Sequence, residues 1–251
     1  MTIVAKSSTV WDQLEKIITV LAQLCILLMC LDVLSFRMGV LPGFIAVSGL
    51  YFMFVGCVLL CLAGFALLVY RFIAFRRVGT EFILLLFLLS APIVARLPAF
   101  GYGSMLPSYT NDVSTNIYSP PEFAYAAALR SESQNNLEAQ SARYSQGLAS
   151  QVAGVESLIV DMPLREAFRR ASYVVALEGW TVVKEDLATG CIEAVSISPI
   201  MGFESDVVIR IVPISTNRSL IDMRSSSRDV TDDYGLNARQ IQRFLSKYRA
   251  L

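Results

Sequence analysis

Four charged side chains on three predicted strands form a group that could bind a ligand. They are Glu193, Arg210, Asp222 and Arg224. Because successive side chains of a strand point to opposite faces, their apolar neighbours share one face and these four share the other. Arginine presents a planar fork of donors that suits a carboxylate or a phosphate. The pattern therefore predicts either an anion site or a ladder of exposed ion pairs, and the ladder is the favoured interpretation.

Carboxylates offer a second kind of chemistry. Asp206 and Asp233 could act as general acid and base in a hydrolase or transferase. Together with Asp232 they could also hold a hard cation, but their spacing matches no calcium loop, so capping and turn formation are favoured. Ser225 and its serine neighbours have no evident base to activate them. The chain has no His, which excludes Ser-His-Asp triads and His-ligated zinc. We expect no cofactor, no metal and no catalysis.

The elements that position these residues can be predicted from the apolar periods after residue 156. The pattern gives a short strand, a helix, four strands and a final helix. Their ranges are 157–160, 163–178, 180–184, 191–198, 207–213, 220–226 and 236–249. Connectors of hairpin length join the second strand to the third and the fourth to the fifth. The predicted fold is an α+β domain, an antiparallel sheet with its helices on one face.

Residues 98–155 have a different composition. The part up to residue 121 is rich in Pro, Gly, Ser, Tyr and Asn, which is typical of an exposed connection with turns. Residues 122–150 are rich in Ala, Ser, Gln and Asn and predict either one long, weakly amphipathic helix or a helical spacer that lies over the domain. The chain then has three regions: a membrane region over 1–97, a linker with a polar helix over 98–155, and an α+β domain over 156–251.

Three apolar runs in the first region predict three transmembrane helices. They cover residues 17–36, 47–70 and 82–97. About 20 helical residues cross a hydrocarbon core of about 30 Å, so the third run is short, and a buried or re-entrant segment is its alternative. Basic residues flank the start of the first run and the end of the second, which favours a cytoplasmic N-terminus. Three crossings would place the domain in the periplasm of a bacterial inner membrane.

Small residues and one acidic residue in the apolar runs indicate how the helices could pack with one another or with a partner in the membrane. Gly49, Gly56 and Gly64 could pack the helices of this chain together, which is favoured, or recruit another membrane protein. Asp32 lies near the end of the first run, where we expect it to be hydrated or paired. The whole chain has 21 basic and 21 acidic side chains, of which residues 98–251 carry 14 basic and 17 acidic ones. This balance gives no basis for nucleic-acid binding, and membrane lipid is the expected partner.

Several blocks after residue 110 resemble the bacterial family known as domain of unknown function 1499. The blocks are residues 111–116, 120–123, 178–180, 192–194, 202–210, 222–228 and 233–241. The chain departs from the family pattern at Asn116 and Ser205, where the family has acids, and at Val230, where it has Gly. Loss of those acids argues against a cation site. The resemblance implies a membrane-associated envelope protein without an assigned activity.

The resemblance also selects candidate ligand-binding residues. They are Asp206, Arg210, Arg224, Ser225, Arg228, Asp233 and Asn237. We expect a non-enzymatic inner-membrane protein whose periplasmic domain binds a partner protein or an anionic envelope component. The alternatives are a periplasmic hydrolase or transferase that uses carboxylates, and an accessory subunit of a membrane complex.

Overall fold

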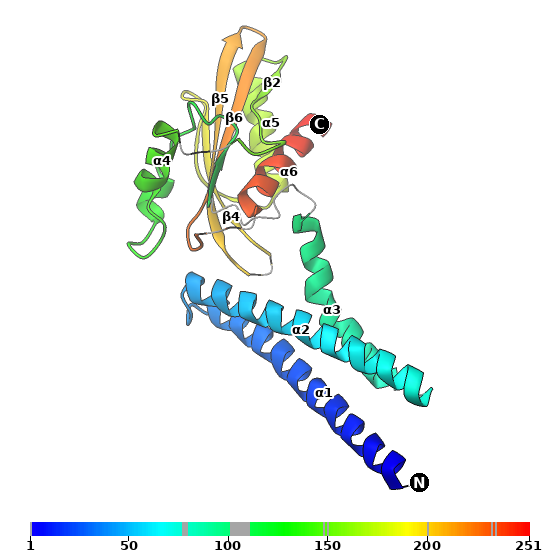
Figure 1. Ribbon diagram of the computed structural model, residues 1–251. Helices are drawn as coiled ribbons and strands as arrows, with labels where there is room; N and C mark the ends of the chain where they lie inside the picture. Colours follow the sequence, from blue (N-terminus) through cyan, green and yellow to red (C-terminus); the bar gives the residue numbers. More distant parts are fainter. Residues whose placement is uncertain are drawn as a thin grey trace. The chain divides into compact units, whose positions relative to one another are not determined.

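The structure is a computed structural model with two compact units, Met1–Tyr102 and Gly103–Leu251 (Figure 1). It describes residues 2–76, 80–100, 111–147, 149, 151–199, 201–231, 233 and 235–251.

Three helices make up the first unit: α1 (Thr2–Arg37), α2 (Gly43–Phe75) and α3 (Thr80–Phe100). Near the end of α2, Arg71 Nη2 lies 3.2 Å from Oδ1 of Asp12, near the start of α1. The Trp11 and Tyr70 rings meet there with centroids 4.3 Å apart. These contacts join the two helices as an antiparallel pair.

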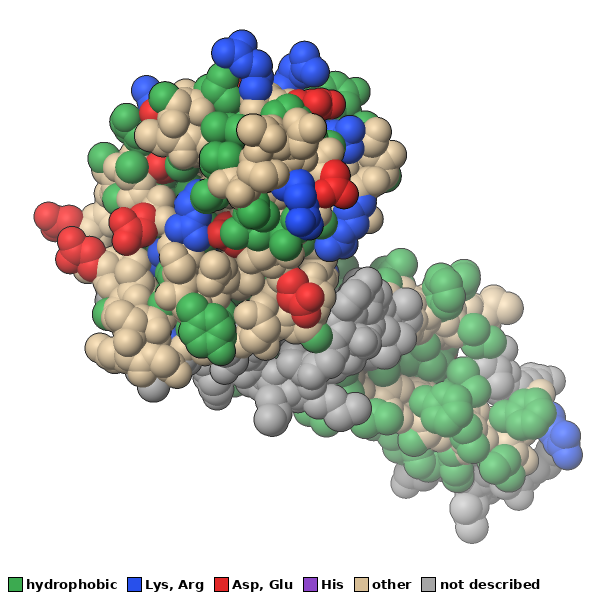
Figure 2. Space-filling view, turned by 90° about the horizontal axis from the view of Figure 1, so that it is seen from above, with side chains coloured by type: hydrophobic (Ala, Val, Ile, Leu, Met, Phe, Trp, Pro, Cys, Tyr) green, Lys and Arg blue, Asp and Glu red, His purple; other side chains and the backbone are tan. Residues whose placement is uncertain are grey.

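Two helices among the described residues are long and apolar enough to cross a membrane. They are Val10–Arg37 and Gly43–Ala74, and most of their side chains are exposed, as the green surface at the lower right of Figure 2 shows. The third apolar segment found there is Phe82–Ala91, which at about 1.5 Å per residue spans only half a hydrocarbon core. The expectation of three spans is corrected to two membrane-length helices.

The small residues of α2 pack against the other helices of this unit. A Cβ added to Gly64 would clash with the Leu86 side chain of α3, and one added to Gly49 would lie 3.0 Å from Asp32 Oδ1 of α1. These glycines therefore bring the chain's own helices together, as favoured from the sequence. Asp32 is buried against α2 and its Oδ2 has no hydrogen-bond partner in the described part of the chain. Oδ2 of Asp32 is therefore not paired in the described part of the chain, and hydration of this carboxylate stays a prediction.

An antiparallel sheet forms the centre of the second unit. Its strands in the described ranges are β1 (Asp112–Ser114), β2 (Leu158–Val160), β3 (Thr181–Asp186), β4 (Cys191–Ile197), β5 (Glu204–Ser215) and β6 (Arg218–Ser227). Their order is β1-β6-β5-β4-β3, and β2 pairs with β6 beside β1. The five strands predicted from the sequence are confirmed. β1 was missed, because residues 98–121 were interpreted as an exposed connection.

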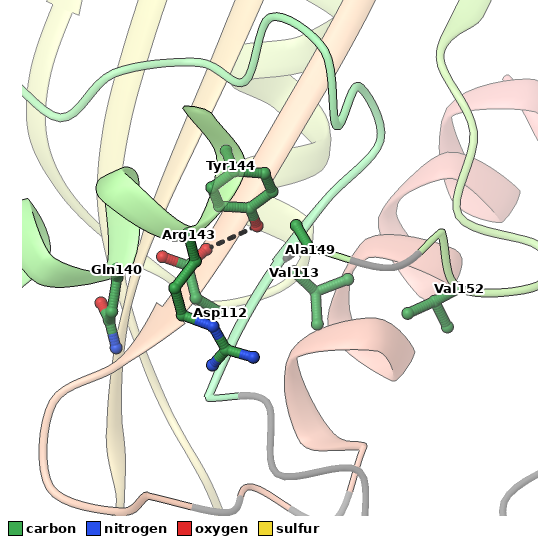
Figure 3. Close-up of a pocket in the computed structure, with 7 residues that line it drawn as sticks. All are labelled: Asp112, Val113, Gln140, Arg143, Tyr144, Ala149 and Val152. Carbon is green, nitrogen blue, oxygen red and sulfur yellow. Dashed lines mark hydrogen bonds between the residues drawn. The ribbon is translucent and has the colours of Figure 1, made fainter. Parts of the chain in front are cut away.

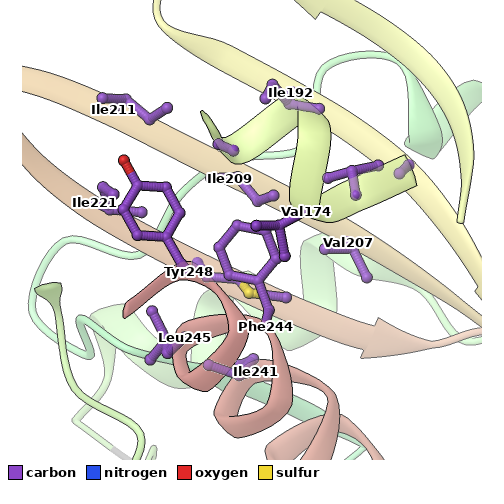
Figure 4. Packing of buried hydrophobic residues seen from close by; sticks show 14 of the residues in the cluster. Val174, Ile192, Val207, Ile209, Ile211, Ile221, Ile241, Phe244, Leu245 and Tyr248 are labelled. Carbon is purple, nitrogen blue, oxygen red and sulfur yellow. The ribbon is translucent and has the colours of Figure 1, made fainter. Parts of the chain in front are cut away.

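Helices α5 (Leu164–Leu177) and α6 (Leu236–Ala250) cover the apolar face of the sheet. Figure 4 shows Phe244 and Tyr248 of α6 against Ile209 and Ile221 of the sheet, and all four are at most 1% exposed. Burying each such side chain contributes roughly 1.5–3 kcal/mol to folding. α5 ends where Gly179 takes a positive φ of 69°, which favours glycine. This core fixes the sheet that carries the candidate residues.

The opposite face of the sheet is also covered. Residues 111–147, which we call the covering segment, contain β1, the 3₁₀ helix η1 (Ala126–Leu129) and α4 (Leu137–Ser145). In Figure 1, α4 lies on the side of the sheet away from α5 and α6. The expectation of helices on one face is therefore wrong. The expectation of one long helix over 122–150 is also wrong, since η1 and α4 are short, but the segment does lie over the domain, as the alternative of a spacer expected.

Candidate functional site

The strand register confirms that the four charged residues share one face. Arg210 lies opposite Asp222, while Val208 lies between Glu193 on one neighbouring strand and Arg224 on the other. The face is not exposed, however, because the covering segment lies on it. Glu193, Asp222 and Arg224 are at most 1% exposed. The predicted ladder of exposed ion pairs is thus wrong, since only Arg210 and Asp222 pair with each other, and Arg224 and Glu193 bind groups of the covering segment.

Arg224 is enclosed on every side by the covering segment and the sheet. Its Nη2 lies 2.6 Å from Asp112 Oδ2, its Nε lies 2.9 Å from Oδ1, and Ser141 Oγ accepts from it at 3.2 Å. The guanidinium also lies between the rings of Phe123 and Tyr144, 5.1 and 4.9 Å from their centroids. Burial alone would lower the pKa of Arg224, but Asp112 outweighs this and raises it. Its donors are occupied within the protein.

Asp206 joins two arginines beneath the covering segment. Its Oδ2 accepts from Arg130 Nε at 2.7 Å and its Oδ1 accepts from Arg228 Nη2 at 2.6 Å. Arg228 Nη1 also reaches Glu204 Oε2 at 2.6 Å. Arg130 was not among the predicted site residues. Burial lowers the pKa of Arg130, while Asp206 opposes that shift. Asp206 is therefore an internal counter-ion.

Asp233 has a different task from Asp206. Its Oδ1 accepts from the Gly235 N–H at 2.8 Å and its Oδ2 accepts from the Asn237 N–H at 2.7 Å. It thus satisfies amides at the start of α6 and complements the helix dipole. The two acids bind different groups, so no acid–base pair forms between them. Asp232 lies outside the described residues.

Ser225 and Asn237 belong to a second buried polar cluster, on the helix-covered face. Ser225 Oγ lies 2.6 Å from Asn237 Oδ1 and 3.0 Å from Gln240 Oε1. Asn237 Nδ2 donates to the carbonyl oxygen of Asn111 at 3.0 Å. Amide groups cannot take a proton from the hydroxyl at neutral pH. Ser225 is consequently held as a structural hydrogen-bonding group rather than an activated nucleophile.

Glu193 and Arg210 attach the covering segment to the sheet. The Glu193 carboxylate accepts from the N–H groups of Ala124 and Ala126, each at 2.8 Å, at the start of η1. Arg210 Nη2 lies 2.7 Å from Asp222 Oδ2 and donates to the Ser119 carbonyl oxygen at 2.6 Å. These two charged side chains thus hold separate points of the covering segment.

The cavity beside this network is too small for a substrate. It measures about 10 Å³ and is lined by Asp112, Val113, Gln140, Arg143, Tyr144, Ala149 and Val152 (Figure 3). That volume is about enough for one water molecule. The Tyr144 hydroxyl donates to Asp112 Oδ1 at 3.0 Å. Among the residues that the structure describes, no group of three His, Cys, Asp or Glu side chains could hold a metal ion.

A larger, open hollow lies where β3, β4 and α6 meet. It measures about 410 Å³ and is lined by Glu178, Gly179, Trp180, Thr181, Ser196, Ile197, Pro199, Arg243 and Lys247. Sequence reasoning did not select this group, since its members come from separate elements. Basic residues one turn apart near the chain end, Arg243 and Lys247, are the signal that could have pointed to it.

Comparisons with known proteins give a family but no activity. No curated protein matches the chain. Two similar solved structures are the di-domain ARO/CYC BexL from the BE-7585A biosynthetic pathway and the ZhuI aromatase/cyclase from Streptomyces sp. R1128. BexL is 16% identical with a TM-score of 0.28, over 38% of this chain and 42% of that one. ZhuI is 10% identical with a TM-score of 0.24, over 38% and 82%.

The alignment with BexL spans less than half of that protein's length, and these low scores carry no functional argument. The family model described as "Protein of unknown function (DUF1499)" matches residues 112–248, which include the covering segment from β1 onward and end within α6. The matched region is more than half of the chain, so the protein belongs to the DUF1499 family.

Proposed function

We propose that this chain is a non-enzymatic, membrane-anchored protein whose sheet unit binds an anionic component of the cell envelope. The buried network supports the absence of catalysis. Asp112, Asp206 and Asp222 each pair with arginine, and Glu193 accepts backbone N–H groups. Carboxylates held in this way are not poised to exchange protons with a substrate.

The exposed basic surface of α5 and α6 carries the proposal. We call it the helical face and define it by Arg165, Arg169, Arg243, Lys247 and Arg249. Tyr173 and Leu177 of α5 are also about half exposed beside these cations. A surface that mixes basic residues with exposed aromatic and aliphatic groups suits anionic lipid headgroups. The binding surface is thus proposed on the helices, because the sheet arginines face inward.

Charge reversal on the helical face tests this function. The full chain in phosphatidylcholine nanodiscs should co-float with added vesicles that contain phosphatidylglycerol, and added salt should weaken the association. Arg165→Glu with Arg169→Glu should weaken binding by roughly 30-fold, since each basic residue near such a surface contributes about 1 kcal/mol.

Arg218→Glu is the matched control, because Arg218 is an exposed arginine on β6 outside the helical face. It should leave the binding nearly unchanged. Equal binding to vesicles with and without phosphatidylglycerol would contradict the proposed function.

Anchoring in the bacterial inner membrane with a cytoplasmic N-terminus is part of the proposal. Lys16, Arg71 and Arg76 lie at one end of the α1–α2 pair, against Arg37 at the other, which supports this orientation. Two crossings return the chain to its starting side. With a cytoplasmic N-terminus this leaves the sheet unit on the cytoplasmic side, facing the anionic lipids of that leaflet, and removes the support for the periplasmic location expected from three spans.

A reporter fused after Leu251 tests that location. A fluorescent protein that folds only in the cytoplasm should be fluorescent there. Activity of a phosphatase that folds only outside the cytoplasm would contradict the proposed two crossings with a cytoplasmic N-terminus.

A further inference from the structure

We propose that the hollow between β3, β4 and α6 binds the anionic head of an amphiphile, a phosphate or carboxylate attached to an apolar chain. This inference rests on the proposed function and gives it a defined site. The hollow is open and has a volume of about 410 Å³. Its lining combines two cations, two further donors and an apolar wall.

Glu178 positions the two cations of the hollow. Its side chain is 1% exposed, its Oε2 accepts from Arg243 Nε at 2.5 Å, and its Oε1 forms an ion pair with Lys247 Nζ at 2.9 Å. The pair with Nε leaves both Nη groups of Arg243 without an acceptor in the described part of the chain, and 54% of the side chain is exposed. One carboxylate against two cations leaves a net charge of +1. The guanidinium fork is thereby held ready for a two-oxygen acceptor.

Two further donors in the lining have no acceptor among the described residues. Trp180 is 6% exposed, and its Nε1 has no hydrogen-bond partner. Ser196 is 3% exposed, and its Oγ accepts from Gln240 Nε2 at 3.0 Å, which leaves its own hydrogen to donate. A buried donor without an acceptor destabilises the protein, so a ligand that supplies acceptors gains by pairing with it. Hydrogen-bond donors without acceptors, next to a net positive charge, favour an anionic ligand.

The apolar wall explains why the ligand is an amphiphile rather than a free ion. Ile197 is 54% exposed at the hollow, where Pro199 also lines it. The Trp180 ring stacks on Phe244 with centroids 6.0 Å apart, which holds the indole in place. An acyl or aromatic group seated on Ile197 and Pro199 would remove this exposed apolar surface from water. A membrane lipid and a soluble organic acid share this chemistry.

The tryptophans of the chain make a direct binding measurement possible. The chain has two, and Trp11 lies in α1, so Trp11→Phe leaves Trp180 as the sole indole. The full chain with this substitution, in phosphatidylcholine nanodiscs, is titrated with a short-chain soluble phosphatidic acid while Trp180 fluorescence is recorded. The expected result is a saturable change. A short-chain diacylglycerol, which lacks the anionic head, should give none.

Substitutions of arginine locate the site. Arg243→Gln should weaken the binding at least tenfold, the loss expected for a charge-assisted hydrogen bond. Arg243→Lys keeps the charge beside Glu178 but removes the fork, and it should also weaken binding. Arg218→Gln is the matched control, because Arg218 lies on β6 outside both the helical face and the hollow lining, and its side chain is 53% exposed where that of Arg243 is 54% exposed. It should leave the affinity unchanged.

Other outcomes would overturn the inference. Equal losses from Arg243→Gln and Arg218→Gln would show a general effect of charge rather than binding in the hollow. Binding of inorganic phosphate as tight as that of the phosphatidic acid would show that the apolar wall has no role. A parallel titration with decanoate instead of the phosphatidic acid separates a soluble carboxylate from a lipid phosphate as the source of the ligand. No response of Trp180 together with intact vesicle binding would refute the hollow and leave the proposed function standing.

Discussion

Arg224→Met is expected to lower the free energy of unfolding of the sheet unit by about 3–5 kcal/mol. The substitution keeps most of the side-chain volume but leaves Asp112 buried without its counter-charge, and removing one partner of a buried pair has an effect of this size. Asp112 would retain the Tyr144 hydroxyl as a donor. The contacts of the guanidinium with two aromatic rings would also be lost. The whole free energy of unfolding of a typical domain is about 5–15 kcal/mol, so this loss would be a large fraction of it.

Urea unfolding of the full chain in mild detergent, followed by Trp180 fluorescence in the Trp11→Phe background, measures the loss. Arg218→Met is the matched control, since the Arg218–Asp161 pair has side chains 53% and 87% exposed. Exposed pairs contribute at most about 1 kcal/mol, so the control should change little. A similar effect of both substitutions would show that Arg224 has no special role under the covering segment.

Alternation along the strands was enough to place the charged residues on one face. Arg210 and Asp222 occur in the predicted strands at positions of equal parity, and the register puts them directly opposite each other. The helices that pack on the apolar face were predicted for the same reason, since their periods are strong. The sheet core can be recognised in the sequence because its buried positions are occupied by apolar residues at regular spacing.

The covering segment could not be predicted in this way, for a physical reason. A layer that lies on a polar face must itself supply polar partners, so Arg130, Ser141 and Tyr144 occur in a stretch with the composition of a linker. That composition is the same for a solvent-exposed connection and for a buried layer whose polar groups are hydrogen-bonded within the protein. The partners of Arg224 and Asp206 lie 112 and 76 residues away in sequence, at Asp112 and Arg130. Such pairings depend on tertiary structure alone.

Asp206→Asn is expected to release the covering segment from the sheet. The substitution keeps the shape of the side chain but removes the charge that lies between Arg130 and Arg228. Two buried arginines would then repel each other, and Arg130, which belongs to the covering segment, can relieve this by leaving. The free energy of unfolding should fall by about 3–5 kcal/mol, as for other broken buried pairs.

Hydrogen exchange separates this release from general destabilisation. Amides of η1 and α4 should exchange faster than those of β4 and β5, because the core between the sheet and α5 and α6 does not depend on Asp206. Glu204→Gln is the matched control, since that side chain also pairs with Arg228 but is 37% exposed. This substitution should lower the free energy of unfolding by at most about 1 kcal/mol. Uniformly faster exchange across both faces of the sheet would show that Asp206 supports the whole unit rather than attachment of the covering segment.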